Sequence, residues 1–396
     1  MRTAARVQRP APPGFFRAWA RWAWIWLACL GLSVGCRHGP PAFYPIGLYS
    51  VPGTRDDLAS VRDAGFNVIT GPADRTFLDA ARAAGLKVLT TPNTTAGDRF
   101  DADAARRAVV AFDRHPAVWA WYLVDEPDLN QVPPEKVRQV QQFFKRLPAH
   151  KPTALVLYKG SDALDYGNIA DLTMIDRYPI PWLPLANFGQ HVRLTRLALG
   201  QHKPLVAVIQ SFDWSAYPEL APPEFPLRAP TFAELRCMTY SALAMRADGL
   251  FYYAYRDRRW DLRQHPSSWD ALRQVVREVN RRRPLFQAEH SWWPHQQDFP
   301  HWSNRFNAAL ESCVALARLR VSPGNVAVPA GDYLLAVNTT PLEQVHRFTP
   351  TPLLEGSIPV FEENRELPIK DGWVEDTLPP FAVRVYGPVT GLAQSP

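Results

Sequence analysis

The sequence predicts a (β/α)8 TIM barrel followed by a small C-terminal all-β sandwich. Short apolar, β-rich runs alternate with helical segments from residue 43 to about 285, which is the pattern of βα units around a parallel sheet. After about Leu310, strand-like runs follow one another without helical segments between them. The 396 residues exceed the usual size of one domain, and 46% hydrophobic against 21% charged residues exclude a disordered chain.

Eight strand-like runs and eight helical segments support the barrel. The strand-like runs are 46–51, 66–71, 87–91, 118–125, 153–158, 171–178, 204–211 and 249–255. The helical segments are 54–64, 74–84, 101–114, 133–147, 160–169, 186–200, 230–247 and 267–282. Thr54 and Asp101 are suited to cap helix N-termini, because their side chains can accept from free backbone N–H groups. Gly65, Gly85 and Gly200 follow helix ends, where a left-handed conformation is common.

The region after the barrel is predicted in three parts. Residues 286–309 form a bridging segment, whose tryptophans we expect at the interface between the domains: Trp292, Trp293 and Trp302. The sandwich occupies 310–388, and a tail occupies 389–396. The expected sandwich strands are 312–321, 331–338, 344–348, 360–362 and 381–386.

Residues 1–35 are predicted to be a signal peptide. An arginine-bearing start precedes an apolar run over 22–34, which is shorter than the roughly 20 residues that a spanning helix needs. Residues 32–36, Leu-Ser-Val-Gly-Cys, resemble a bacterial lipobox, which implies a lipid anchor on Cys36 and a tether over 36–42. The plainer alternative is an ordinary signal peptide with an incidental cysteine. We therefore expect an exported protein of the bacterial cell envelope, attached to the membrane.

The charge of the mature chain argues against nucleic-acid binding. The formal net charge is +6, but five arginines and no acidic residue lie in the predicted signal peptide, so +1 remains after its removal. A chain so close to neutral lacks the basic surface that phosphate backbones require.

Polar residues follow three of the predicted barrel strands. Asp125 ends the fourth strand and Glu126 follows it, Asp176 lies at the end of the sixth, and Tyr255, Arg256 and Asp257 follow one another at the end of the eighth. Active sites of βα barrels lie at the C-terminal ends of the strands, so these residues are candidates for a site. The plainer reading is that the carboxylates cap a loop or pair with an arginine.

Paired carboxylates at a barrel mouth are suited to glycoside cleavage. One carboxyl group with a raised pKa protonates the leaving oxygen, while a second assists at the anomeric centre. Neighbouring carboxylates do not ionise together easily. We therefore expect the proximity of Asp125, Glu126 and Asp176 to raise the pKa of at least one of these three carboxyl groups.

Residues 121–127, Trp-Tyr-Leu-Val-Asp-Glu-Pro, resemble the strand-four signature of clan A glycoside hydrolases, in which Asn-Glu-Pro supplies the acid/base glutamate. The chain is similar to uncharacterised bacterial glycosidase-like lipoproteins through 125–128, 176–179, 209–214 and 249–253. The resemblance implies that Glu126 is the proton donor, with Asp125 in place of the asparagine. We therefore predict a glycosidase with Glu126 as acid and Asp125 and Asp176 as assisting carboxylates.

The seventh strand departs from the clan A pattern, because it ends Val-Ile-Gln-Ser-Phe over 208–212 and carries no nucleophilic glutamate. Asp176 or Asp213 could act as base for a water molecule, giving inversion. Alternatively, the Asp-Glu pair resembles that of hexosaminidases, where an acetamido group of the substrate is the nucleophile. As a third alternative, the protein is a carbohydrate-binding cell-envelope lipoprotein without catalysis.

Aromatic and polar residues after the strands are the expected contacts of an oligo- or polysaccharide, since flat rings pack on sugar faces and polar groups meet hydroxyls. The candidates are Gln210, Tyr178, Trp182, Trp214, Tyr255 and Arg256. No metal-ligand spacing, Gly-rich phosphate loop or nucleophile-elbow motif occurs in the sequence. The sequence therefore predicts no metal, no nucleotide cofactor and no other cofactor.

Overall fold

The computed structural model describes residues 43–91, 100–222, 224–291, 313–324, 327–348 and 356–389. The predicted signal peptide, Cys36 and the tether lie outside the described residues, as do Trp292, Trp293 and Trp302. Within the described ranges, no helix is long and apolar enough to cross a membrane.

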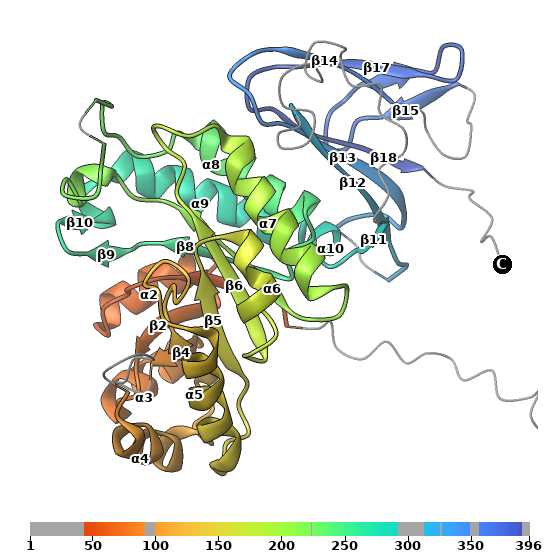
Figure 1. Ribbon diagram of the computed structural model, residues 1–396. Coiled ribbons are helices and arrows are strands. Elements are labelled where there is room, and N and C mark those ends of the chain that lie inside the picture. Colours follow the sequence, from red (N-terminus) through yellow and green to blue (C-terminus); the bar gives the residue numbers. More distant parts are fainter. Residues whose placement is uncertain are drawn as a thin grey trace, which may run out of the picture. The chain divides into compact units, whose positions relative to one another are not determined.

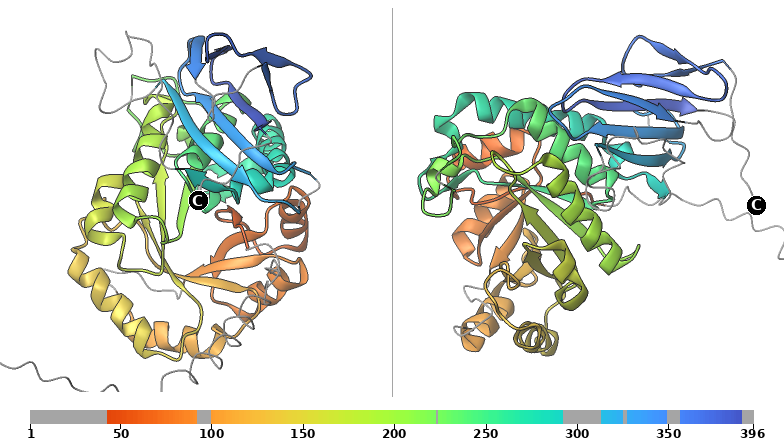
Figure 2. Two further views of the ribbon diagram at one scale, coloured as in Figure 1. Left: turned by 90° about the vertical axis from the view of Figure 1, so that its right-hand side faces the viewer. Right: turned by 45° about the horizontal axis from the view of Figure 1, so that its top comes forward.

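The predicted barrel is confirmed, because eight parallel strands close in the order β1 to β8 (Figures 1 and 2). The strands are β1 (Ile46–Leu48), β2 (Val68–Pro72), β3 (Lys87–Thr91), β4 (Val118–Val124), β5 (Thr153–Leu157), β6 (Leu172–Arg177), β7 (Leu205–Gln210) and β8 (Gly249–Tyr253). β8 pairs with β1 and closes the barrel. A Cβ on Gly47 would lie 2.3 Å from the Phe251 ring, so glycine there leaves room for that ring in the barrel interior.

Helices follow the barrel strands along the chain and surround the barrel (Figure 2). They are α2 (Arg55–Asp63), α3 (Arg75–Ala83), α4 (Ala102–Phe112), α5 (Pro134–Arg146), α6 (Ala163–Tyr166), α7 (Leu185–Leu199), α8 (Phe232–Ala244) and α9 (Pro266–Arg281), with α10 (Arg283–Phe286) after them. The predicted caps are confirmed, because Thr54 accepts from the N–H of Asp57 and Asp101 from that of Ala104.

The barrel has two apolar layers. The interior contains Leu89, Val156, Val208 and Phe251, all essentially inaccessible to solvent. A second layer lies between the strands and the helices, and it continues into the C-terminal domain through residues such as Leu335. This packing leaves the C-terminal strand ends free to carry polar side chains.

The C-terminal domain is built from antiparallel sheets. A four-stranded sheet has the order β11 (Glu289–Ser291), β12 (Val314–Val321), β13 (Gly331–Asn338) and β18 (Val383–Val389). Two smaller sheets pair β14 (Gln344–Phe348) with β17 (Val374–Leu378) and β15 (Ser357–Pro359) with β16 (Glu366–Pro368). The predicted all-β fold is thus confirmed.

The strand prediction for this domain needs correction in three places. β11 lies in the predicted bridging segment, where it pairs with β12. β15, β16 and β17 were not predicted, and at 360–362 the structure has an isolated bridge between Val360 and Tyr386. Short strands such as these leave little periodic signal in a sequence.

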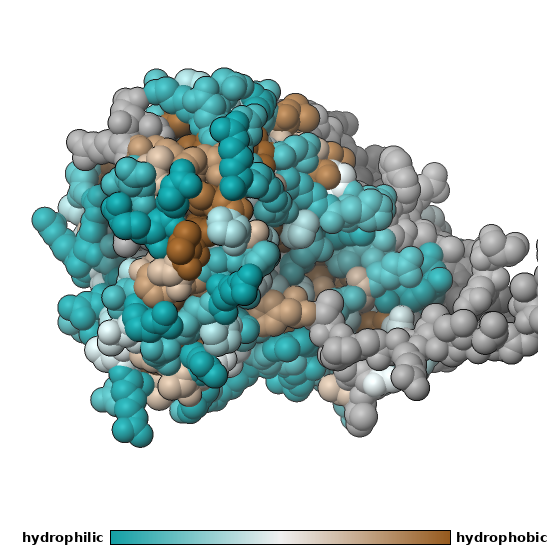
Figure 3. Space-filling view, turned by 90° about the horizontal axis from the view of Figure 1, so that it is seen from below, coloured by the Kyte–Doolittle hydropathy of each residue, from teal (hydrophilic) through white to brown (hydrophobic). Residues whose placement is uncertain are grey.

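The face of the molecule that Figure 3 shows is mainly hydrophilic. In the face that Figure 3 shows, hydrophilic side chains surround a narrow area of hydrophobic ones. Exposed apolar side chains elsewhere on the chain, such as Val110, Leu164 and Leu342, are far apart in sequence. Single exposed apolar residues are normal on protein surfaces and need no partner.

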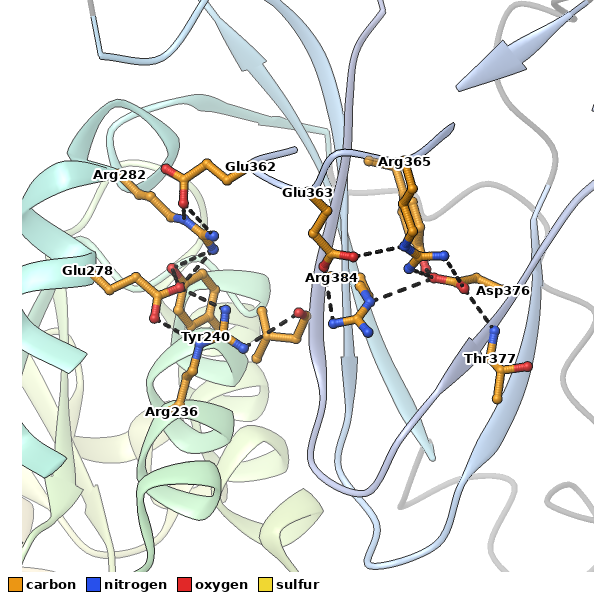
Figure 4. A network of polar contacts seen from close by, with 12 residues as sticks. Arg236, Tyr240, Glu278, Arg282, Glu362, Glu363, Arg365, Asp376, Thr377 and Arg384 are labelled. Atoms are coloured by element: carbon orange, nitrogen blue, oxygen red, sulfur yellow. Dashed lines mark hydrogen bonds and ion pairs between the residues drawn. The ribbon is translucent and has the colours of Figure 1, made fainter. Parts of the chain in front are cut away.

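A buried ionic network joins the barrel to the C-terminal domain (Figure 4). Glu278 of α9 accepts from Arg236 at 2.7 and 2.8 Å and from the Tyr240 hydroxyl at 2.8 Å. Arg282 lies 2.8 Å from Glu278 and donates to Glu362 of the C-terminal domain at 2.8 Å. Glu278 therefore organises two arginines, one of which contacts the second domain.

We expect Glu278→Gln to lower the free energy of unfolding by about 3–5 kcal/mol, because it leaves the buried Arg282 and the partly buried Arg236 short of a countercharge. Urea denaturation measures the change. The matched control is Glu375→Gln, which breaks an exposed ion pair with Arg347 and should cost less than about 1 kcal/mol. Equal losses in both variants would contradict the role given to Glu278.

Candidate active site

A cavity of about 510 Å³ lies where the barrel strands end. Its walls come from residues at or beyond the C-terminal ends of β1 and β4 to β8, which is where active sites of this fold lie. The lining residues are Tyr49, Asp125, Glu126, Leu129, Tyr158, Asp176, Arg177, Tyr178, Trp182, Leu183, Phe212, Trp214, Tyr217, Leu220, Pro222, Tyr253, Asp257 and Arg258.

Asp125 and Glu126 occupy the bend after β4, a strand that is apolar throughout. Glu126 has a φ of +41°, which costs energy for a residue that is not glycine. Hydrogen bonds hold the bend, since the Glu126 N–H donates to Val156 of β5 at 3.1 Å and the Glu126 carbonyl accepts from Asn130 at 2.9 Å. The backbone therefore holds the Glu126 side chain at the cavity.

Asp125, Glu126 and Asp176 form one interacting carboxyl cluster, as predicted from the strand ends. Asp176, at the end of β6, is only 5% exposed and hydrogen-bonds with Glu126. Burial, and then the charge of Asp125, raise the pKa of Glu126 to about 7, although the hydrogen bond with Asp176 opposes this. Burial and the charge of Glu126 raise the pKa of Asp176 well above its usual value. The cluster therefore retains a proton near neutral pH.

Two phenols orient the aspartates of this cluster. The Tyr122 hydroxyl donates to Oδ1 of Asp125, and the Tyr178 hydroxyl donates to Oδ2 of Asp176 at 3.1 Å. Asp125 is accessible from the cavity even though protein atoms surround it, and burial raises its pKa. Each aspartate thus has a defined orientation, and Asp125 faces any bound molecule.

Aromatic rings form one wall of the cavity. Trp182 and Trp214 lie 4.9 Å apart between ring centroids, and Tyr178 packs edge-on against Phe212 at 5.2 Å. The predicted contacts Tyr178, Trp182 and Trp214 all line the cavity. Rings of this kind can pack against the apolar faces of a sugar.

The structure corrects three predicted substrate contacts. Gln210 is fully buried, with its amide accepting from the N–H of Ile180 and donating to the Ile180 carbonyl, both at 2.8 Å. The Tyr255 hydroxyl donates to Asp57 of α2 at 2.9 Å. Arg256 is exposed and lies 3.8 Å from Asp261. None of the three lines the cavity, because each is directed to a partner elsewhere.

The sequence placed Asp257 at the barrel rim, after the eighth strand, but assigned it no role in the site. In the structure Asp257 accepts from the hydroxyls of Tyr217 and Tyr253, at 2.7 and 2.5 Å, and lines the cavity. Arg177 and Arg258 also line the cavity. Asp257 lies only four residues beyond the end of β8, so the rule that made Asp125 a site candidate applies to it equally.

In the parts of the chain that the structure describes, no three His, Cys, Asp or Glu residues are grouped so that they could hold a metal ion.

The chain matches no known family model and no curated protein sequence. Its fold matches solved structures at low identity. These include the β-galactosidase from Bacillus circulans sp. alkalophilus, with 9% identity over 88% of this chain and 99% of that chain and a TM-score of 0.58. They also include a catalytic mutant of Gan42B, a GH42 β-galactosidase from G. stearothermophilus, with 9% identity, coverage of 87% and 98%, and a TM-score of 0.56.

An α-amylase from Geobacillus thermoleovorans, solved in complex with acarbose, matches as well, with 10% identity, coverage of 87% and 97%, and a TM-score of 0.55. All three proteins are glycoside hydrolases. The chain thus has the fold of TIM-barrel glycoside hydrolases, and at this identity the likeness concerns the fold alone.

The raised pKa of Glu126 predicts how stability changes with pH. Between its usual value of 4.5 and about 7, the folded state holds a proton that the unfolded chain releases, so stability falls as pH rises through this window. We expect Glu126→Gln to melt at a higher temperature than wild type at pH 8, and this advantage to shrink toward pH 5. Thermal unfolding at both pH values, with the exposed Glu135→Gln as control, measures it. An advantage that is the same at both pH values would contradict the raised pKa.

Proposed function

We propose that this protein is a glycoside hydrolase that cleaves O-glycosidic bonds, with Glu126 as the general acid. The observation that carries the proposal is the carboxyl cluster that retains a proton at the floor of an aromatic-walled cavity. A carboxyl group with a pKa near 7 is protonated often enough at neutral pH to donate and acidic enough to do so readily. The likeness in fold to β-galactosidases and an α-amylase supports the same class of reaction.

Each member of the cluster has a role in this proposal. Glu126 protonates the oxygen of the leaving sugar as its bond to the anomeric carbon breaks. Burial and the charge of Glu126 raise the pKa of Asp176, which therefore holds a proton of its own and orients the Glu126 carboxyl group through their hydrogen bond. Asp125 is accessible from the cavity, where its free oxygen can accept from a sugar hydroxyl. Tyr178, Trp182 and Trp214 form the wall against which the sugar rings pack.

We expect Glu126→Gln to lower kcat/KM by about 10²–10⁴-fold, because the amide has no proton to give. The assay measures product from a panel of α- and β-linked aryl glycosides and oligosaccharides, with Glu135→Gln as the matched surface control. Wild-type activity should also fall as pH rises above about 7, where Glu126 loses its proton. Unchanged turnover by Glu126→Gln would overturn this assignment.

A second candidate function follows from the end of β7. Gln210 stands where clan A enzymes carry a nucleophilic glutamate, and its amide is committed to the Ile180 loop. This favours a non-catalytic carbohydrate-binding protein of the cell envelope. The same panel separates the two functions, since a binding protein retains glycan affinity in calorimetry while wild type forms no product.

We also propose that the chain is exported and attached to the bacterial membrane through a lipid on Cys36. The lipobox-like residues 32–36 support this attachment. When the full chain is expressed in a bacterium with labelled palmitate, we expect label on wild type and none on Cys36→Ser. Cys29→Ser, within the apolar run, is the matched control and should keep the label. Label that persists on Cys36→Ser would contradict the anchor.

A further inference from the structure

The carboxyl cluster can supply a proton to the leaving group, but it contains no residue placed to activate the water that attacks the anomeric carbon. Glycosidases that use two carboxyl groups need the second one on the opposite side of the scissile bond from the acid. Asp176 hydrogen-bonds with Glu126, and Asp125 directly precedes it in the chain. All three therefore belong to the same side of the cavity.

Asp257 is the remaining carboxylate in the described cavity wall. It lies four residues beyond β8 and accepts from Tyr253 at the end of that strand, and in a closed barrel of eight strands β8 lies opposite β4, which Glu126 follows. Asp257 thus enters the cavity wall from the side of β8, opposite the strand that precedes Glu126. Asp213, which also follows a barrel strand, accepts from the N–H of Ser215 at 2.7 Å and does not line the cavity.

The Asp257 carboxylate is held in a defined orientation. The hydroxyls of Tyr217 and Tyr253 both donate to its Oδ2. Within the described residues no hydrogen bond reaches its Oδ1, so this oxygen is available to a molecule in the cavity. Two phenol donors on one carboxylate oxygen hold the side chain in a fixed orientation, as supporting hydrogen bonds do for residues of a functional site.

Stacked phenols link Asp257 to the cluster. The Tyr253 ring stacks on the Tyr178 ring with 5.6 Å between centroids, and the Tyr178 hydroxyl donates to Asp176. The rings of Tyr178 and Tyr253 thus lie between the hydrogen-bonded contacts of Asp176 and those of Asp257. Inverting glycosidases keep their carboxyl groups about 6.5–9.5 Å apart, because a water molecule must fit beside the sugar.

We propose that Asp257 is the second catalytic carboxylate, the base for an attacking water, and that the enzyme inverts the anomeric configuration. The assignment rests on the glycosidase function proposed above. Glu126 gives its proton to the glycosidic oxygen as the bond from that oxygen to the anomeric carbon breaks. Oδ1 of Asp257 takes a proton from the water whose oxygen bonds to the opposite face of that carbon. One water is consumed, two hydroxyl groups result, and solvent returns both carboxyl groups to their starting states.

The dependence of kcat on the leaving group of the substrate distinguishes a variant that lacks the acid from one that lacks the base. On a 4-nitrophenyl glycoside that wild type hydrolyses, we expect both Glu126→Gln and Asp257→Asn to lose about 10²–10⁴-fold in kcat. On the matching 2,4-dinitrophenyl glycoside, whose leaving group needs little protonation, Glu126→Gln should recover most of the loss and Asp257→Asn should not. The exposed Glu135→Gln is the control and should stay within about twofold of wild type.

Azide and product stereochemistry complete the test. Azide needs no base, so it should restore turnover to Asp257→Asn and form a glycosyl azide of inverted configuration. The first product of wild type, followed by proton NMR, should also be inverted, and this measurement requires no variant to fold.

If the first product of wild type keeps the anomeric configuration of the substrate, the role of Asp257 is wrong, while the proposed glycosidase function stands. The same conclusion follows if Asp257→Asn is fully active and Glu126→Gln is inactive. No turnover of any glycoside by wild type would overturn both.

Discussion

The pairing of β8 with β1 is the constraint on which the site depends. Three residue pairs, from Ile46 with Leu250 to Leu48 with Tyr252, close the sheet into a barrel. Closure brings the ends of β4, β6 and β8 to one rim, although they are separated by up to about 130 residues in the chain. Without closure, Glu126 and Asp176 would not share a hydrogen bond, and Asp257 would not line the same cavity.

The carboxyl cluster destabilises the folded state, and apolar packing elsewhere in the barrel compensates for this. Burying three interacting carboxyl groups raises the free energy of the folded state wherever they ionise. The strained φ of Glu126 adds to that cost. The interior packing of β4 and β8 and the ionic network around Glu278 lie outside the cavity and stabilise the fold. Stability and chemistry are thus assigned to different parts of the barrel, as in other folds of this type.

Sequence patterns predicted the barrel well because each strand is a separate apolar run, and β3 was predicted at its observed bounds. They also placed Asp125, Glu126 and Asp176 at the cavity, since a strand end specifies the rim. They failed where the direction of a side chain depends on distant contacts. Gln210 turns to Ile180, 30 residues away, and Tyr255 turns to Asp57, 198 residues away. No local pattern contains those partners.

The two groups of acids in the cavity differ in their neighbours, and this difference determines what each can do. Glu126 is largely buried beside Asp125, and burial and then the charge of Asp125 favour its protonated form and suit it to giving a proton. Asp257 accepts from two phenols through Oδ2, which holds its side chain in place, and its Oδ1 is left for a molecule in the cavity. The absence of a glutamate on β7 therefore does not leave the cavity without an acceptor, because Asp257 provides one from the side of β8, opposite the strand that precedes Glu126.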